Sequence, residues 1–81
     1  MQLRIKFFAA LREIIGTEEI RLDWSRGMTD QDVMNLLKQR FREIAPLLDH
    51  SLVAVNGEYT EPAHVLMPED EIAVLPPVSG G

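Results

Sequence analysis

The sequence predicts an α+β fold in which one mixed β-sheet is covered on one face by a single main helix. Apolar and polar residues alternate near both ends of the chain, which is typical of strands with one buried face. Between those segments, apolar residues recur every three or four positions, which indicates an amphipathic helix. With 81 residues, of which 46% are hydrophobic and 26% charged, the chain has the size and composition of a single folded domain.

The first part of the chain predicts two strands and a short helix. Residues 3–7 alternate, and we expect a strand. Residues 9–15 follow as a short helix, which Gly16 should end. Residues 19–24 alternate again, and their closeness in sequence favours antiparallel pairing with the first strand. Phe8 breaks the first alternation, because it falls on the side where polar residues are expected.

The main helix is expected to begin after Thr29. A threonine at the N-cap, followed three residues later by Asp32, forms a short version of the capping box. Pro46 should prevent the helix from continuing. The apolar stripe that this helix would lay across the sheet consists of Val33, Leu37, Phe41 and Ile44.

The second half of the chain predicts the remaining strands. Residues 52–55 form an apolar run suited to a central strand, and Asn56-Gly57 is a strong tight-turn signal before a short return at 58–60. Residues 71–75 alternate and form the last strand, which Pro76-Pro77 should end. The order strand, strand, helix, strand, short strand, strand is that of the β-grasp, or ubiquitin-like, layout. That layout requires the last strand to lie parallel beside the first, which periodicity alone does not establish.

We expect residues 1–76 to form the β-grasp domain and residues 77–81 to form a flexible, extended C-terminal tail. The two prolines lack amide protons and favour an extended backbone. From Val78 the chain could reach about 13 Å when extended. Gly80-Gly81 has no side chains, so it can enter a narrow channel and present a carboxylate to another protein. A frayed end is the alternative interpretation of the same residues.

An apolar docking patch is predicted beside the tail. If Ile72 and Val74 pack under the helix, Leu75 faces the other way. With the first and last strands adjacent, Phe8 and Leu75 would form this patch, and Tyr59 could extend it. Contiguous exposed apolar area usually marks an interface. The alternative is that Phe8 is half-buried under a loop.

Composition narrows the function classes. A net charge of −5 disfavours a nucleic-acid partner, since phosphate binding needs a basic face. The chain has no cysteine and no apolar run of the length of a membrane span, so we expect a cytoplasmic protein without a membrane partner. His50 and His64 are isolated, which gives no metal-ligand set. No pair of carboxylates has the spacing of an acid–base dyad, and glycine-rich phosphate loops are absent.

Several motifs together resemble the small subunit of molybdopterin synthase, a ubiquitin-like sulfur carrier. They are Phe7-Phe8-Ala9 with Arg12-Glu13 and Gly16, then Ala54-Val55-Asn56, and finally Pro76 to Gly81. The resemblance covers essentially the whole chain. This sequence departs from the family pattern at Glu69, where the family usually has glycine, and at Leu75, which is often aromatic in relatives.

The resemblance implies a carrier that is not catalytic alone. An adenylating and sulfurylating partner enzyme would use ATP to activate the Gly81 carboxylate and convert it to a thiocarboxylate. The tail, comprising Gly80 and the preceding Pro76, Pro77, Val78 and Ser79, would then enter the large synthase subunit. There the sulfur would be donated to a pterin precursor to form the molybdopterin dithiolene. The family's complex is a heterotetramer, and no cofactor is expected on the small subunit itself.

Three alternatives use the same features. The chain could be a ubiquitin-like protein modifier that is joined to lysines through Gly81. It could be a sulfur carrier of the thiamin pathway, although those relatives usually lack the Phe-Phe-Ala and Pro-Pro-Val motifs. It could also be a structural interaction domain in which Gly80-Gly81 is accidental; removing Gly81 would then leave its activity unchanged.

Overall fold

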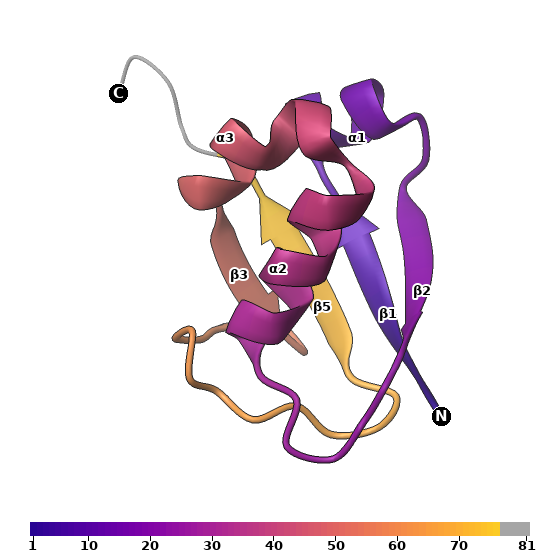
Figure 1. Cartoon of the computed structure of the whole chain (residues 1–81), viewed down its shortest axis with the longest axis vertical. Coiled ribbons are helices and arrows are strands. Elements are labelled where there is room, and N and C mark those ends of the chain that lie inside the picture. Colours follow the sequence, from indigo (N-terminus) through magenta and orange to yellow (C-terminus); the bar gives the residue numbers. More distant parts are fainter. Residues whose placement is uncertain (77–81) are drawn as a thin grey trace.

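The computed structural model describes residues 1–76, which form one five-stranded mixed sheet with helices on one face (Figure 1). The strand order is β2-β1-β5-β3-β4, so the last strand of the chain lies in the middle of the sheet. The strands are β1 (Gln2–Phe7), β2 (Glu19–Asp23), β3 (Leu52–Val55), β4 (Glu58–Tyr59) and β5 (Glu71–Leu75). This is the predicted β-grasp layout.

The pairing that closes the sheet is the parallel contact between β1 and β5. Ile5 lies opposite Ile72, and Phe7 lies opposite Val74. All four side chains are almost completely buried, because alternate residues of both strands point towards the helices. β2 flanks β1 on the outside, while β3 pairs with β5 and with β4; these three pairings are antiparallel.

The two expected helices are present with the expected caps. α1 (Ala9–Ile15) ends at Gly16, which adopts the left-handed conformation with φ 85° and donates its amide to the Arg12 carbonyl. α2 (Asp30–Arg40) begins at Thr29. There the Thr29 amide donates to the Asp32 carboxylate at 2.9 Å, and the Asp32 amide donates to the Thr29 hydroxyl at 3.3 Å, completing the capping box.

The main helix is present but ends earlier than the sequence predicts. α2 ends at Arg40, and a 3₁₀ turn, η1 (Arg42–Ile44), leads into a further helix, α3 (Ala45–Asp49). Pro46 lies in the first turn of α3, where a missing amide proton costs no helical hydrogen bond. The proline therefore begins a helix here instead of ending one.

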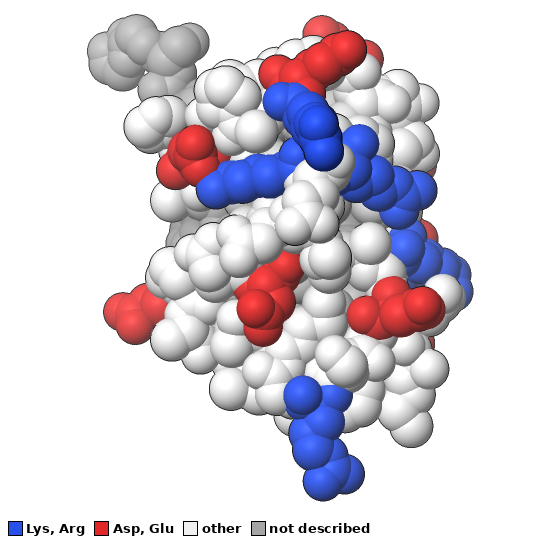
Figure 2. All heavy atoms as spheres, in the orientation of Figure 1, with Lys and Arg blue, Asp and Glu red and all other residues white. Residues whose placement is uncertain are grey.

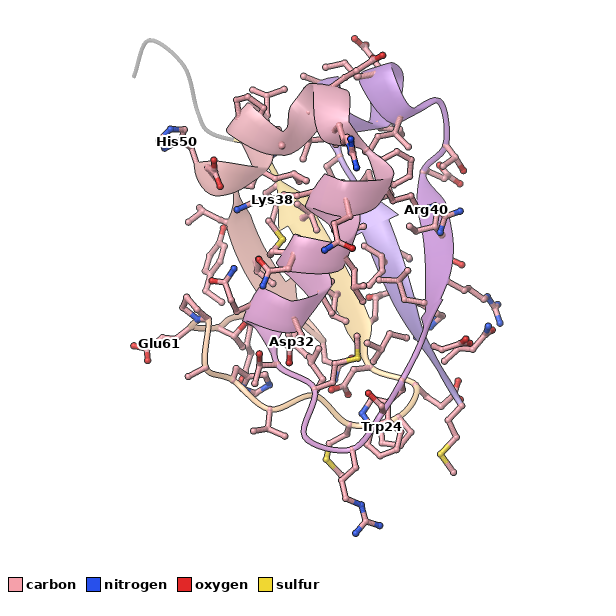
Figure 3. The ribbon with its side chains drawn as sticks, in the orientation of Figure 1. Trp24, Asp32, Lys38, Arg40, His50 and Glu61 are labelled. Atoms are coloured by element: carbon pink, nitrogen blue, oxygen red, sulfur yellow. The ribbon has the colours of Figure 1, made fainter. Side chains whose placement is uncertain are left out.

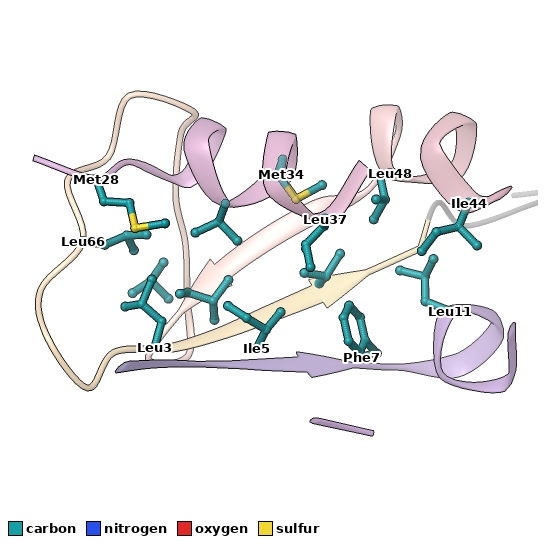
Figure 4. Packing of buried hydrophobic residues seen from close by; sticks show 14 residues of the cluster. Leu3, Ile5, Phe7, Leu11, Met28, Met34, Leu37, Ile44, Leu48 and Leu66 are labelled. Carbon is teal, nitrogen blue, oxygen red and sulfur yellow. The ribbon is translucent and has the colours of Figure 1, made fainter. Parts of the chain in front are cut away.

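The core fills the space between the sheet and the helices (Figure 4). Leu37 of α2 is completely buried, and Ile44 of η1 and Leu48 of α3 add to the same cluster. Phe41 caps α2 and meets the Phe7 ring edge-on, with centroids 6.0 Å apart. Two residues predicted to continue the helical stripe, Phe41 and Ile44, thus reach the core from beyond the end of α2.

Left-handed backbone occurs in the turn between β3 and β4 and in the turn before β5. Asn56 and Gly57, with φ of 51° and 87°, form the predicted tight turn between β3 and β4. Glu69, in the turn before β5, also has a positive φ of 70°. That conformation favours glycine.

Candidate functional site: the open sheet face around the origin of the tail

The site is the face of the sheet that the helices leave uncovered, at the end where β5 finishes. β5 ends at Leu75, and Pro76, which is half-buried, is the last described residue. The last described residues therefore lie at the end of a strand in the middle of the sheet (Figure 1). The other predicted tail residues, Pro77, Val78, Ser79, Gly80 and Gly81, lie outside the described part of the chain, and their roles remain predictions.

Three apolar side chains surround the end of β5, and we call them the open-face patch: Phe8, Leu52 and Leu75. Phe8 follows β1 with an extended backbone, so its side chain is on the opposite side from buried Phe7, and it is 42% exposed. Leu75 is half-buried, and Leu52 of β3 lies directly opposite it in the register, 52% exposed. The adjacency of β1 and β5 that the predicted patch required is therefore present.

Tyr59 lies on the same face but farther away, on the edge strand β4. It is opposite Ala54 of β3, which in turn is opposite Ala73 of β5. The Tyr59 side chain is 71% exposed, and two small alanines separate it from the β1 side of the sheet. The face is therefore low and flat between Tyr59 and the open-face patch, a shape that suits contact with another protein surface.

Leu52 is the residue of the patch that sequence reasoning missed. The sequence indicated only that residues 52–55 suit a central strand, whereas in the structure Ala54 and Val55 are buried and Leu52 is exposed. The alternation on β5 could have identified Leu52. It places Leu75 on the open face, and Leu52, which is paired with Leu75 across the strands, must share that face.

Charged side chains border the patch on β1 and β5. Glu71 Oε1 forms an ion pair with Lys6 Nζ at 2.8 Å and a longer one with Arg4 Nη1 at 3.8 Å. The hydrogen bond to Lys6 lowers the pKa of Glu71, and the same bond raises the pKa of Lys6. Two cations share one carboxylate here, so this border is locally positive although the chain as a whole carries −5.

Within residues 1–76, no three acidic or histidine side chains are placed to hold a metal ion together. In the same part of the chain, no helix is long and apolar enough to cross a membrane. The open-face patch and its border are surface features, which suit binding more than catalysis.

Fold and site together define a ubiquitin-like β-grasp domain whose described part ends just after its central strand. The chain belongs to the ThiS family, whose sequence model matches residues 5–81. It is 37% identical to a molybdopterin synthase sulfur carrier subunit of Dictyostelium discoideum, covering 99% of this chain and 96% of the relative. It is also 33% identical to small archaeal modifier protein 1 of Haloferax volcanii, over 94% and 97% of the two chains.

Solved structures agree with this assignment. The crystal structure of SAMP1 from Haloferax volcanii superposes with a TM-score of 0.85 at 29% identity, covering all of both chains. One chain from a complex of subunits 1 and 2 of the molybdopterin-converting factor of Helicobacter pylori superposes with a TM-score of 0.71 at 23% identity, again over the whole of both chains. The second likeness establishes the shared fold.

Proposed function

We propose that this chain is a sulfur carrier for molybdopterin synthesis and that Gly81 is the residue that carries the sulfur. A partner adenylating enzyme joins the Gly81 carboxylate to the α-phosphate of ATP, and pyrophosphate leaves. Hydrosulfide then attacks the acyl-adenylate carbon; a C–S bond forms, the C–O bond to AMP breaks, a proton is lost, and a thiocarboxylate results. In the large synthase subunit this sulfur bonds to a carbon of a pterin precursor, and hydrolysis of the resulting thioester breaks the C–S bond to Gly81 and restores its carboxylate.

The observation that carries the proposal is the position of the end of β5. This strand is central in the sheet, and the open-face patch lies where it finishes at Leu75. A partner that docks on the patch would therefore hold the tail at a defined distance from its own active site. Family membership and the sulfur carrier relatives support the same function.

The chemistry must then be divided between proteins. A carboxylate is a poor electrophile, so ATP supplies the leaving group, and the acids, bases and cations that assist belong to the partners. The carrier contributes a tail without side chains at its last two positions and a surface that positions it. We place this cycle in the cytoplasm, where ATP is available.

The test is an intact-mass measurement on N-terminally tagged chain recovered from its own cells, with the C-terminus left free. A species shifted by one oxygen-to-sulfur exchange, mapped to Gly81, is the expected result. A chain lacking Gly81 serves as the control and should show no such species. If only unmodified mass is found even after addition of the adenylating enzyme, ATP and a sulfur source, the proposal is wrong.

The docking role of the open-face patch is tested separately. Leu52→Asp and Leu75→Asp each place a charge in the proposed contact, and we expect about tenfold weaker binding to the purified large subunit in calorimetry. Leu36→Asp is the matched control, because Leu36 is 40% exposed on α2, on the other face of the domain. Equal affinities for all three variants would remove the open face as the docking surface.

A second function has its own supporting observation, the similarity to small archaeal modifier protein 1. The same activated Gly81 could be attacked by a lysine amine of another protein, with AMP or sulfide leaving and an isopeptide bond forming. The mass experiment separates the two functions: a modifier gives large adducts joined through Gly81 to lysines, whereas a dedicated carrier gives the thiocarboxylate alone.

A further inference from the structure

A groove of about 400 Å³ lies on the helix side of the domain, between the C-terminal ends of α1 and α2. Its apolar lining comes from Ile14, Ile15, Phe41 and Ile44. Ile14 is 52% exposed, although it is a large aliphatic residue in a small acidic domain. Ile44 and Phe41 belong to the core or pack against it, so the exposed apolar part of the groove is supplied mainly by Ile14, which is no part of the open-face patch.

The groove exists because α2 stops early. At Phe41 the backbone leaves the helical conformation, with φ −123° and ψ 69°, and η1 turns away from the α2 axis. Phe41 is held in place by its edge-on contact with Phe7 in the core. The wall of the groove is thus anchored to the sheet, which makes it a fixed feature of the fold.

Two arginines border the apolar lining. The Arg40 guanidinium lies over the Phe41 ring, 5.4 Å from its centroid, and Arg42 follows on η1. Within residues 1–76, neither arginine lies within ion-pair distance of a carboxylate, whereas Lys38 on the same helix is paired with Asp49. Figure 2 shows basic side chains gathered over the helix face, and Figure 3 places Arg40 on the side of α2 towards β2.

We propose that this groove docks an acidic segment of a partner protein, with a large apolar side chain against Ile14 and Phe41 and carboxylates at Arg40 and Arg42. Both guanidiniums are suited to carboxylates, which they can bind through paired hydrogen bonds. Because the groove lining is also apolar, the ligand should carry a large apolar side chain in addition to its carboxylates. One carboxylate, Glu43, also lines the groove and opposes an acidic ligand.

The groove and the open-face patch lie on opposite sides of the sheet. A partner on the helix side would therefore leave the open-face patch free, and both surfaces could be occupied at once. The inference does not depend on the sulfur carrier function. It predicts that groove binding persists in a chain that lacks Gly80 and Gly81.

The test is an NMR titration of the isotopically labelled full chain. The probe is a mixture of short acetylated peptides in which aspartates and glutamates flank a pair of large apolar residues; the control mixture has lysines in place of the acids. Acidic peptides should shift the amides of residues 14–15 and 40–44. The proposal is overturned if they cause no shifts at millimolar concentration, if the lysine peptides bind equally, or if the shifts fall on the open face.

Variants sharpen the result. Arg40→Gln and Arg42→Gln should each weaken acidic-peptide binding severalfold, and together by about tenfold or more. Glu43→Gln should strengthen it, because a repulsive charge is removed. Arg26→Gln is the matched control, since Arg26 is exposed in the turn after β2, outside the groove lining. Thermal melts verify that each variant is folded; unchanged affinity in the folded double variant would refute the proposal.

Discussion

Glu69 carries a backbone conformation that suits glycine, and replacing it tests how much strain the loop before β5 stores. At φ 70° a residue with a Cβ is disfavoured by roughly 1–2 kcal/mol relative to its right-handed conformations. Glycine removes that cost but loses roughly 0.4–1 kcal/mol through the greater freedom of the unfolded chain. The expected net effect of Glu69→Gly is therefore a stabilisation of about 0.5–1 kcal/mol.

The structure indicates that little else changes in this variant. Glu69 is exposed, and within residues 1–76 its carboxylate makes no ion pair. Its amide donates to the Gln2 carbonyl at 3.0 Å, and glycine keeps that amide. For a domain of this size, the gain corresponds to a rise in Tm of about 2–8 °C.

The assay is urea and thermal unfolding followed by circular dichroism, with two variants that impose the opposite change. Gly16→Ala and Gly57→Ala introduce a Cβ at φ 85° and 87°, where no other atom lies within 4 Å. Each should therefore cost about 1 kcal/mol through backbone conformation alone. If both alanine variants lose stability and Glu69→Gly gains none, the strain assigned to Glu69 is refuted.

Three further predictions follow from the core and its borders. The Asp30 side chain is buried, and desolvation raises its pKa, so its contribution to stability is present in acid and is lost as pH rises through the raised pKa. Asp30→Asn should therefore gain stability relative to the parent as pH increases. A difference in unfolding free energy that stays constant when urea titrations are repeated across pH would contradict this. Leu37→Ala, at a fully buried position, should cost about 2–5 kcal/mol in urea unfolding, and a loss below 1 kcal/mol would mean that the site collapses around the gap. The Trp24 indole donates to the Leu66 carbonyl at 2.9 Å, so Trp24→Phe should lower stability by about 1–2 kcal/mol; an unchanged Tm would show that this hydrogen bond contributes nothing net.

Local patterns were sufficient for most elements of the fold. Alternation at residues 3–7 and 71–75 predicted β1 and β5, and the Thr29–Asp32 capping box predicted the start of α2. These features were readable because each depends on residues close together in sequence. The neighbour relation between β1 and β5 came from matching the element order to a known layout, since no local pattern encodes it.

The end of α2 could not be predicted in the same way. Phe41 and Ile44 keep helical spacing in the sequence, although the backbone has already left the helical conformation at Phe41. That departure accompanies a tertiary contact, the edge-on packing of Phe41 against Phe7, which no local pattern encodes. Pro46 was ambiguous because proline can end one helix or begin another. The groove beside Arg40 was missed for the same reason, since it forms only where the helix stops.

The central position of β5 has a mechanical consequence. β5 is hydrogen-bonded along both of its edges, to β1 on one side and β3 on the other. A pull on the residues that follow Leu75 would act along the strand and load both rows of hydrogen bonds in shear, so they would resist together. A partner could therefore apply force to the C-terminal end of the chain while β5, which bears the load, remains among the last parts of the domain to unfold.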